Sequence, residues 1–187
     1  YMSANILSAY RTGAVPGVGY KHLSKPDSKV AAIIGPGVMS KTALAAIMAV
    51  RPGIETIKVK GRGKASLEKF IAHVKKEYPQ VNVYAVDTME EAVRDADIVS
   101  ASTSTPTGDP SQYPYIKEEW IKPGALISST AALRFDDDFI IHRARTVTDN
   151  IKLYEAWEEE MKPNAYNTGS SRDGSDCRGQ DETGAGG

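Results

Sequence analysis

A glycine-rich turn at residues 35–42 carries the two patterns in this chain that could do chemistry. Gly35-x-Gly37-x-x-Ser40 is a variant of a dinucleotide-binding turn, in which the first glycine permits a tight bend and the second lets backbone approach a diphosphate. The same stretch also resembles a triphosphate-binding loop, with Lys41 for the phosphates and Thr42 for a magnesium ion. The turn therefore predicts a phosphate site, and either ligand fits its spacing.

Residues inside and beyond the turn favour the dinucleotide. A triphosphate loop needs glycine where Ser40 stands, and it wraps phosphates with its own N–H groups, of which Pro36 removes one. Asp87 is the acidic residue that would hold the metal ion in that alternative. In the dinucleotide interpretation, Val38 and Met39 open a helix whose first N–H groups face phosphate oxygens. A tight turn that holds nothing is the third possibility.

Three basic residues follow the second predicted strand and bear on the choice of cofactor. Lys60, Arg62 and Lys64 stand where a dinucleotide-binding domain meets the adenosine ribose, and no carboxylate accompanies them. An acidic residue there favours NAD, whereas an arginine can bind a 2′-phosphate through two parallel hydrogen bonds. The pattern predicts NADP as the cofactor, with NAD as the alternative. A basic loop that is merely solvated fits the same residues.

These residues must be positioned by an alternation of short strands and helices. Repeated alternation predicts an α/β fold with a doubly wound, Rossmann-like parallel sheet and helices on both faces. It also places the glycine-rich turn at the carboxyl ends of the strands, where ligands gather. The predicted strands cover 30–34, 54–59, 81–86, 97–101, the region near 126, and 146–148. The predicted helices cover 38–50, 66–77, 136–144 and a capped segment from residue 88.

The chain is expected to divide into four parts. The first contains a short helix at 3–12, a turn-rich stretch at 13–19 and a second short helix ending near residue 23. The last has almost nothing to bury and is expected to be disordered. The parts are connecting helices at 1–28, a dinucleotide-binding domain at 29–150, a returning helix at 151–166 and a tail at 167–187.

Composition narrows the class of function. The 187 residues suffice for one ordinary domain, and a net charge of -1 gives no reason to expect nucleic acid or membrane partners. The single cysteine, Cys177, cannot form an internal disulfide, so a cytoplasmic location is expected. No metal site is expected, because His22, His73 and His142 lack the spacing of metal ligands.

Three segments, SAYRTGAVPGVGYKHLSKPDSKVAAIIGPGVMSKTAL, EEAVRDADIVSASTST and WIKPGALIS, occur in a characteristic order. Together they resemble the ornithine cyclodeaminase/mu-crystallin family over about residues 5–160. The resemblance implies a Rossmann domain beside a dimerising substrate domain, and a fragment in which that second domain is largely missing. It further implies a homodimer that acts on a small amino acid or imine with a nicotinamide cofactor.

The resemblance also assigns roles to individual residues. Arg11 matches the family arginine that holds the substrate carboxylate, and Thr12 would lie near the cofactor phosphates. Ser102, Thr103 and Ser104 would line the nicotinamide ribose. Without the resemblance, Arg11 would be interpreted as an ordinary surface residue at a helix end.

One departure from the family bears on the reaction. Cyclodeaminases of the family carry a proton-handling aspartate after the fifth strand, where this sequence has Leu133, which cannot transfer a proton. Asp136, Asp137 and Asp138 follow, but they are typical of the first turn of a helix. We therefore expect an NAD(P)-dependent oxidoreductase acting on an amino acid or its imine or oxo-acid counterpart. The alternatives are a cyclodeaminase with bound NAD and a non-catalytic cofactor- or ligand-binding protein.

Overall fold

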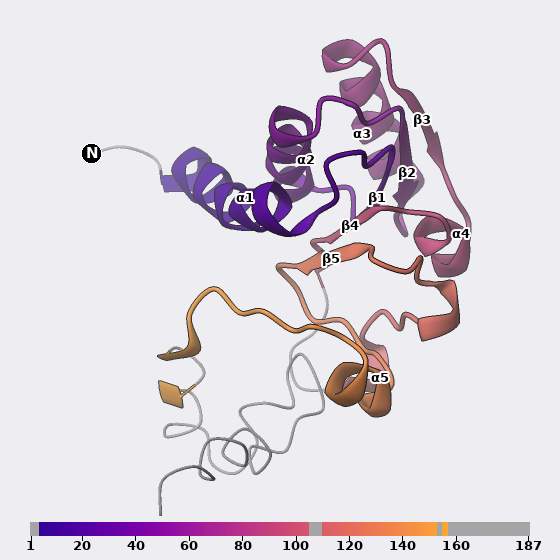
Figure 1. Ribbon diagram of the computed structural model, residues 1–187. Coiled ribbons are helices and arrows are strands. Elements are labelled where there is room, and N and C mark those ends of the chain that lie inside the picture. The colour runs from indigo at the N-terminus through magenta and orange to yellow at the C-terminus, as the bar shows by residue number, and fades with distance from the viewer. Residues whose placement is uncertain (1–3, 105–109, 153–154, 157–187) are drawn as a thin grey trace, which may run out of the picture.

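The computed structural model describes residues 4–104, 110–152, 155 and 156, and their strands form one parallel sheet in the order β3-β2-β1-β4-β5 (Figure 1). The predicted doubly wound α/β class is confirmed. The strands are β1 (Val30–Ile34), β2 (Thr56–Lys60), β3 (Asn82–Ala85), β4 (Ile98–Ala101) and β5 (Leu126–Ser129). The helices are α1 (Ala4–Leu23), α2 (Val38–Val50), α3 (Lys64–Glu77), α4 (Met89–Val93) and α5 (Asp137–His142), with short 3-10 helices at Pro110–Gln112 and Glu118–Trp120.

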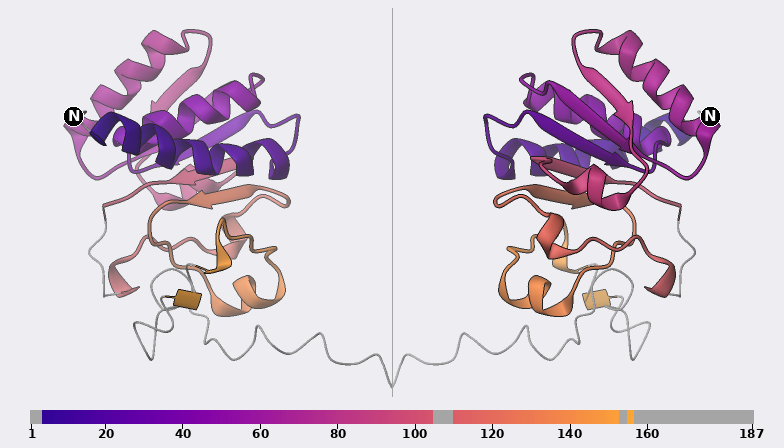
Figure 2. Two further views of the ribbon diagram at one scale, coloured as in Figure 1. Left: turned by 90° about the vertical axis from the view of Figure 1, so that its left-hand side faces the viewer. Right: turned by 90° about the vertical axis from the view of Figure 1, so that its right-hand side faces the viewer.

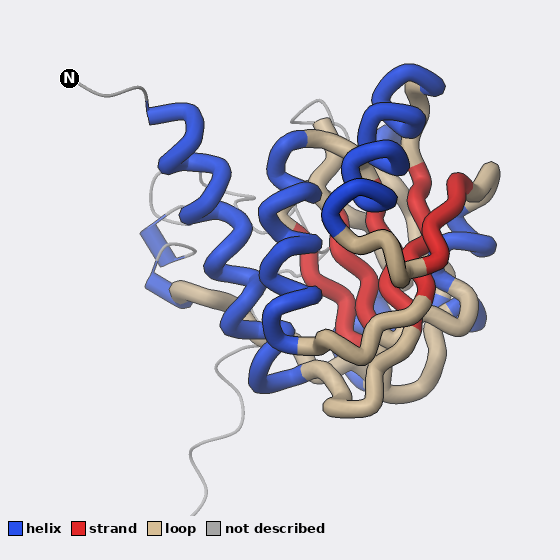
Figure 3. Tube along the Cα trace, turned by 90° about the horizontal axis from the view of Figure 1, so that it is seen from above, coloured by secondary structure: helices blue, strands red, loops and turns tan. Residues whose placement is uncertain are grey.

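Helices cover both faces of the sheet, as the alternation predicts. The three long helices α1, α2 and α3 lie on one side, and α4 lies on the other (Figures 1 and 3). The segment that contains α5 lies beyond the β5 edge (Figure 2). None of the helices in the described ranges is long and apolar enough to cross a membrane.

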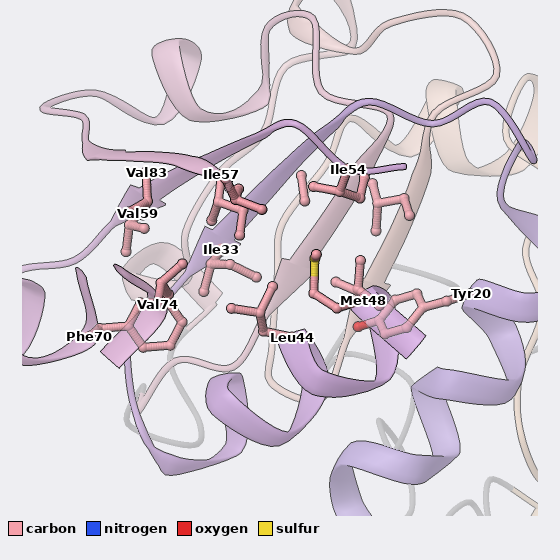
Figure 4. Packing of buried hydrophobic residues seen from close by; sticks show 14 residues of the cluster. Tyr20, Ile33, Leu44, Met48, Ile54, Ile57, Val59, Phe70, Val74 and Val83 are labelled. Carbon is pink, nitrogen blue, oxygen red and sulfur yellow. The ribbon is translucent and has the colours of Figure 1, made fainter. Parts of the chain in front are cut away.

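Two hydrophobic clusters hold these layers together, one on each face. Side chains alternate along β1, so that Ala31 and Ile33 join the cluster under the long helices while Ala32 and Ile34 join the other. Because both faces are buried, β1 is apolar throughout. Figure 4 shows the first cluster, which includes Tyr20, Leu44, Met48, Ile57, Phe70 and Val74.

The amino-terminal segment corrects a prediction. The turn-rich stretch expected at 13–19 is absent, and α1 is one continuous helix with Pro16 inside it. The reason is packing against α2: a Cβ atom on Gly13 would collide with Thr42, and one on Gly17 would lie 3.0 Å from the Ala46 Cβ. The two glycines share one helix face and allow close approach of α1 to α2, which offsets their low helix propensity.

The carboxyl-terminal part corrects a second prediction. Residues 146–148 form no strand and are exposed, and in the described part of the chain the sheet ends at β5. Three exposed residues without a neighbouring strand have neither the ladder hydrogen bonds nor the burial that a strand requires. Of the helix expected at 151–166, residues 151, 152, 155 and 156 are helical. The rest of that helix and the tail expected at 167–187 lie outside the described residues.

Asp97 ties together the amino ends of the strands. Its side chain, only 9% exposed, accepts hydrogen bonds from the backbone N–H groups of Lys29 at 2.8 Å and Val30 at 3.0 Å. It also accepts one from the Lys122 ammonium group. Burial raises the pKa of Asp97, but these hydrogen bonds outweigh burial and leave the pKa below its ordinary value. The carboxylate therefore stabilises the fold above pH 4 or so, and that stabilisation is lost as the pH falls through the depressed pKa.

Replacing Asp97 with asparagine is expected to lower the free energy of unfolding by about 1–3 kcal/mol at pH 7, because an amide cannot accept from all three donors. The deficit relative to the wild type should shrink as the pH falls from about 4 through the depressed pKa, because the wild-type carboxyl group then becomes protonated as well. Urea unfolding at pH 7 and pH 3 measures both effects. The exposed Asp149→Asn serves as the control, and an equal deficit at both pH values would contradict this account of Asp97.

Candidate cofactor-binding site

The turn after β1 strongly favours glycine at its first position. Gly35 has φ +85°, a conformation that L-residues with side chains rarely adopt. A Cβ atom there would lie 2.5 Å from the Ser102 carbonyl oxygen. The Gly35 N–H donates to the Lys60 carbonyl oxygen at 2.8 Å, so the turn is fixed against the ends of both neighbouring strands.

The second glycine stands at an open helix end. Gly37 is the N-cap of α2, no side chain caps this end, and an added Cβ atom would meet nothing within 4 Å. Ser40 is fully buried and its hydroxyl donates to the Gly35 carbonyl oxygen, which ties the turn to the first turn of α2. The first N–H groups of a helix have no partner within it, so those of Val38, Met39 and Ser40 remain for a ligand. An uncapped amino end beside an open glycine fits a diphosphate.

The ends of β4 and β5 supply hydroxyl groups beside this turn. The Ser102 N–H donates to the Ile34 carbonyl oxygen at 2.9 Å, and the Ser102 and Thr130 hydroxyls form a 2.7 Å hydrogen bond. Thr103 and Ser104 follow, Thr103 half-buried and Ser104 exposed. β1 pairs with β2 on one side and with β4 on the other, so the strand order reverses at β1. The carboxyl end of β1 is therefore the topological switch point, where doubly wound sheets bind ligands.

Thr130 was missed by the sequence analysis. The signal for it lies in the parallel register, in which Ser100 is opposite Ser128 and Ala101 is opposite Ser129. Continuing that register by one residue puts Thr130 opposite Ser102. Sequence reasoning could find this pair only once β4 and β5 were known to be neighbours.

Of the three basic residues, Lys60 ends β2, Arg62 lies in the loop after it, and Lys64 is the first residue of α3, which begins two residues earlier than the predicted helix at 66–77. Lys60 is half-buried, whereas Arg62 and Lys64 are exposed. None of the three belongs to an ion pair among the described residues. The Arg62 guanidinium donates to the Ser104 carbonyl oxygen at 2.9 Å. Their positive charge is therefore not neutralised by a neighbouring carboxylate of the described chain.

Arg11 and Thr12 lie on α1, at the level of the first turns of α2. The two helices run parallel, because the Thr42 hydroxyl near the start of α2 donates to the Ala9 carbonyl oxygen while Arg51 at its end donates to the Lys21 carbonyl oxygen. Both residues thus lie towards the carboxyl edge of the sheet. Arg11 is exposed and Thr12 half-buried. Arg11 is two residues from Ala9, which faces α2, so it lies on the opposite side of α1, and its role towards a substrate stays a prediction.

The residues of the triphosphate alternative do not converge. Lys41 lines a groove of about 430 Å³ between α1, α2 and α3, together with Tyr10, His73 and Glu77. The Thr42 hydroxyl donates to the carbonyl oxygens of Ala9 and Met39 and is occupied within the helical layer. Asp87 follows β3, which β2 separates from β1. The geometry supports the dinucleotide interpretation of the turn.

Leu133 and the acidic residues after it are structural. Leu133 is 3% exposed and belongs to the hydrophobic cluster on the α4 side of the sheet. Asp136 is the N-cap residue of α5, and Asp138 forms an ion pair with Arg143. The prediction that these aspartates begin a helix is confirmed.

The strand order, the glycine turn and the open end of α2 together define a Rossmann-type dinucleotide-binding domain. The chain belongs to the ornithine cyclodeaminase/mu-crystallin family, whose family model matches residues 1–176. The resemblance stated from the sequence is thereby confirmed.

Individual relatives agree with this assignment. The chain is 28% identical to the N-((2S)-2-amino-2-carboxyethyl)-L-glutamate dehydrogenase of Staphylococcus aureus, covering 80% of this chain and 43% of the relative. It is 32% identical to the ketimine reductase mu-crystallin of Macropus fuliginosus, covering 72% and 39%. A solved structure of Thermococcus litoralis Delta(1)-pyrroline-2-carboxylate reductase in complex with NADH and L-proline superposes with a TM-score of 0.61 at 32% identity, covering 70% and 37%. The chain thus spans about two fifths of the length of each relative.

Proposed function

We propose that the complete protein is an NADP(H)-dependent oxidoreductase that transfers hydride between the cofactor and an amino acid, or its imine or oxo-acid counterpart. The observation that carries the proposal is the open amino end of α2 at Gly37, next to the hydroxyl pair of Ser102 and Thr130. The relatives support the reaction class, because each is named as a dehydrogenase or reductase of an amino-acid derivative.

The residues of this chain hold the cofactor and the substrate in position and supply the groups that attract their negative charges. When bound, the nicotinamide cofactor supplies the hydride chemistry. The N–H groups that begin α2 hold its diphosphate, and Ser102, Thr103 and Thr130 line the nicotinamide ribose side. Arg11 orients the substrate carboxylate, as the family resemblance implies, through the two parallel hydrogen bonds that a guanidinium group forms.

We assign NADP rather than NAD as the preferred cofactor. Lys60, Arg62 and Lys64 present uncompensated positive charge at the end of β2, where the adenosine ribose lies in such domains. A 2′-phosphate carries about two negative charges and accepts charge-assisted hydrogen bonds from these groups. The Thermococcus relative was solved with NADH, so NAD is the alternative to be tested directly.

Dehydrogenation or imine reduction is favoured over cyclodeamination. Leu133 is buried among apolar residues and offers no group that could exchange a proton with a substrate amine. The alternatives remain a cyclodeaminase with bound NAD and a protein that binds cofactor without turnover. Activity of the complete protein separates these alternatives.

The complete protein is also proposed to be a cytoplasmic homodimer whose second domain packs beside residues 29–150. The exposed apolar residues of α1 support packing of further protein there, since Leu7, Tyr10 and Val18 are 60%, 65% and 63% exposed. The division of the chain into connecting helices, dinucleotide domain, returning helix and tail is part of the same proposal.

Calorimetric titration of the complete protein with NADPH, NADH and ATP tests the proposal. We expect NADPH to bind at least about tenfold more tightly than NADH, the ratio given by one charge-assisted hydrogen bond, and ATP to bind more weakly than either. Oxidation of NADPH should then be measured with pyruvate plus amines and with cyclic imines. Preference for ATP would contradict the cofactor assignment, and tight NADPH binding without turnover would support the non-catalytic alternative.

A further inference from the structure

Arg62 forms a bridge across the mouth of the candidate site. Its guanidinium group donates to the Ser104 carbonyl oxygen at 2.9 Å, although the two residues are 42 positions apart. Arg62 belongs to the loop after β2, and Ser104 to the segment after β4. Because β1 lies between β2 and β4, the bridge spans the carboxyl end of β1, where the glycine turn begins.

The loops beneath this bridge are packed tightly. A Cβ atom on Gly61 would lie 2.7 Å from the Pro36 ring, and one on Gly35 would lie 2.5 Å from the Ser102 carbonyl oxygen. The loops after β2, β1 and β4 therefore form a continuous row in which each touches the next. Arg62 contributes a long, exposed side chain to this row of loops.

The guanidinium group is held by a neutral acceptor. Within the described ranges no carboxylate pairs with Arg62, so its full charge rests on one carbonyl oxygen and on solvent. A phosphate can accept two parallel hydrogen bonds from one guanidinium and adds the attraction of opposite charges, neither of which a single neutral carbonyl oxygen supplies. A 2′-phosphate at the end of β2 is thus a better partner for Arg62 than Ser104 is.

We propose that Arg62 is a two-position specificity residue, which bridges to Ser104 across the crevice without cofactor and transfers to the 2′-phosphate when NADP(H) binds. This inference rests on the proposed function and deepens it. NADP(H) replaces the bond that it breaks with a stronger one, whereas NAD(H) breaks the same bond and offers no phosphate in return. Arg62 therefore discriminates twice, by attracting one cofactor and by obstructing the other.

The double role predicts opposite effects on the two cofactors in one variant. In the complete protein, Arg62→Ala should weaken NADPH binding by about 10- to 100-fold, because a charge-assisted contact is lost. The same variant should tighten NADH binding by about two- to tenfold, because the bridge to Ser104 no longer has to be broken. Calorimetric titration with each cofactor measures both constants. A residue that only attracts phosphate would not tighten NADH binding.

Two smaller ligands measure the contribution of the 2′-phosphate to binding separately from the rest of the cofactor. Adenosine 2′,5′-bisphosphate and adenosine 5′-monophosphate differ only in the 2′-phosphate, and the first should lose affinity and the second gain affinity in Arg62→Ala. Lys69→Ala removes one exposed charge from the adjacent helix α3 and is the matched control, expected to change each constant by less than about twofold. Arg62→Lys keeps the charge without the planar fork and should fall between wild type and Arg62→Ala.

Two results would overturn the inference. An unchanged ratio of the two binding constants in Arg62→Ala would give Arg62 no part in specificity. Weaker NADPH binding without tighter NADH binding would make Arg62 only a phosphate contact, without the obstructing role. If the wild type binds neither cofactor, the proposed function fails and this inference fails with it. If both cofactors bind and only the ratio of their dissociation constants fails to change as predicted, the proposed function stands and the inference about Arg62 fails.

Discussion

Replacing Gly37 with alanine is expected to weaken NADPH binding by about 10- to 100-fold while the complete protein stays folded. The added methyl group would enter the open space at the amino end of α2, where the diphosphate must approach the N–H groups. Losing one or two charge-assisted hydrogen bonds has an effect of this size. The cost to the fold is at most about 1 kcal/mol, because φ is −103° and alanine adopts it, although alanine is a poorer N-cap.

Calorimetry and thermal unfolding together measure this Gly37 prediction. Gly53→Ala is the matched control, because Gly53 lies beyond the opposite end of α2 and the nearest atom to an added Cβ, Lys29 Nζ, is 3.9 Å away. It should leave NADPH affinity unchanged. Unaltered affinity in Gly37→Ala would show that the diphosphate does not sit at this helix end.

Replacing Gly35 with alanine is expected to lower the free energy of unfolding by about 2–4 kcal/mol. An L-residue at φ +85° is strained by roughly 1–2 kcal/mol. Its Cβ atom would also lie 2.5 Å from the Ser102 carbonyl oxygen. That oxygen cannot easily retreat, because the Ser102 N–H is bonded to Ile34. The turn must therefore shift, with a further cost typical of a strained backbone.

Urea unfolding of the complete protein measures the Gly35 effect, and Gly37→Ala is the natural comparison. The two glycines are two residues apart, yet one substitution should mainly disturb the fold and the other mainly the ligand. A loss below about 1 kcal/mol in Gly35→Ala would mean that the turn adapts more readily than its contacts indicate.

The sequence predicted the sheet well where local pattern and tertiary role agree. The apolar run of β1 was placed at its observed bounds, because a strand that is buried on both faces is apolar at every position. The start of α4 was also predicted correctly, because the capping box of Thr88 and Glu91 is a local signal.

The prediction from the sequence was wrong where residues contact an element that is distant along the chain. Gly13, Pro16 and Gly17 have the composition of a turn, but the glycines face Thr42 and Ala46 of a helix that lies 29 residues further along the chain. Tyr20 strengthens that packing through a buried 2.8 Å hydrogen bond to Ser100. Local propensity cannot foresee such contacts, because they exist only after the sheet has formed.

The candidate site shows the same division. Gly35 and Gly37 could be proposed from their spacing, since a phosphate-binding helix end has a local sequence signature, and the basic residues from their place after the second predicted strand. Thr130 and the bridge from Arg62 to Ser104 were not, because each depends on which strands are neighbours. Strand order is a property of the fold, and no local pattern encodes it.

The most direct test of the central claim is hydrogen–deuterium exchange of the complete protein with and without NADPH. Our account predicts that the cofactor slows exchange in the peptide covering residues 37–44, because it bonds the N–H groups that begin α2. Exchange at residues 71–77 of α3, which border the groove between the long helices, should not change. Because the groove is lined by Lys41 and Thr42 of α2 as well as by His73 and Glu77 of α3, a cofactor bound there would also slow exchange at residues 71–77. Protection of residues 71–77, with or without protection of 37–44, would therefore contradict the account.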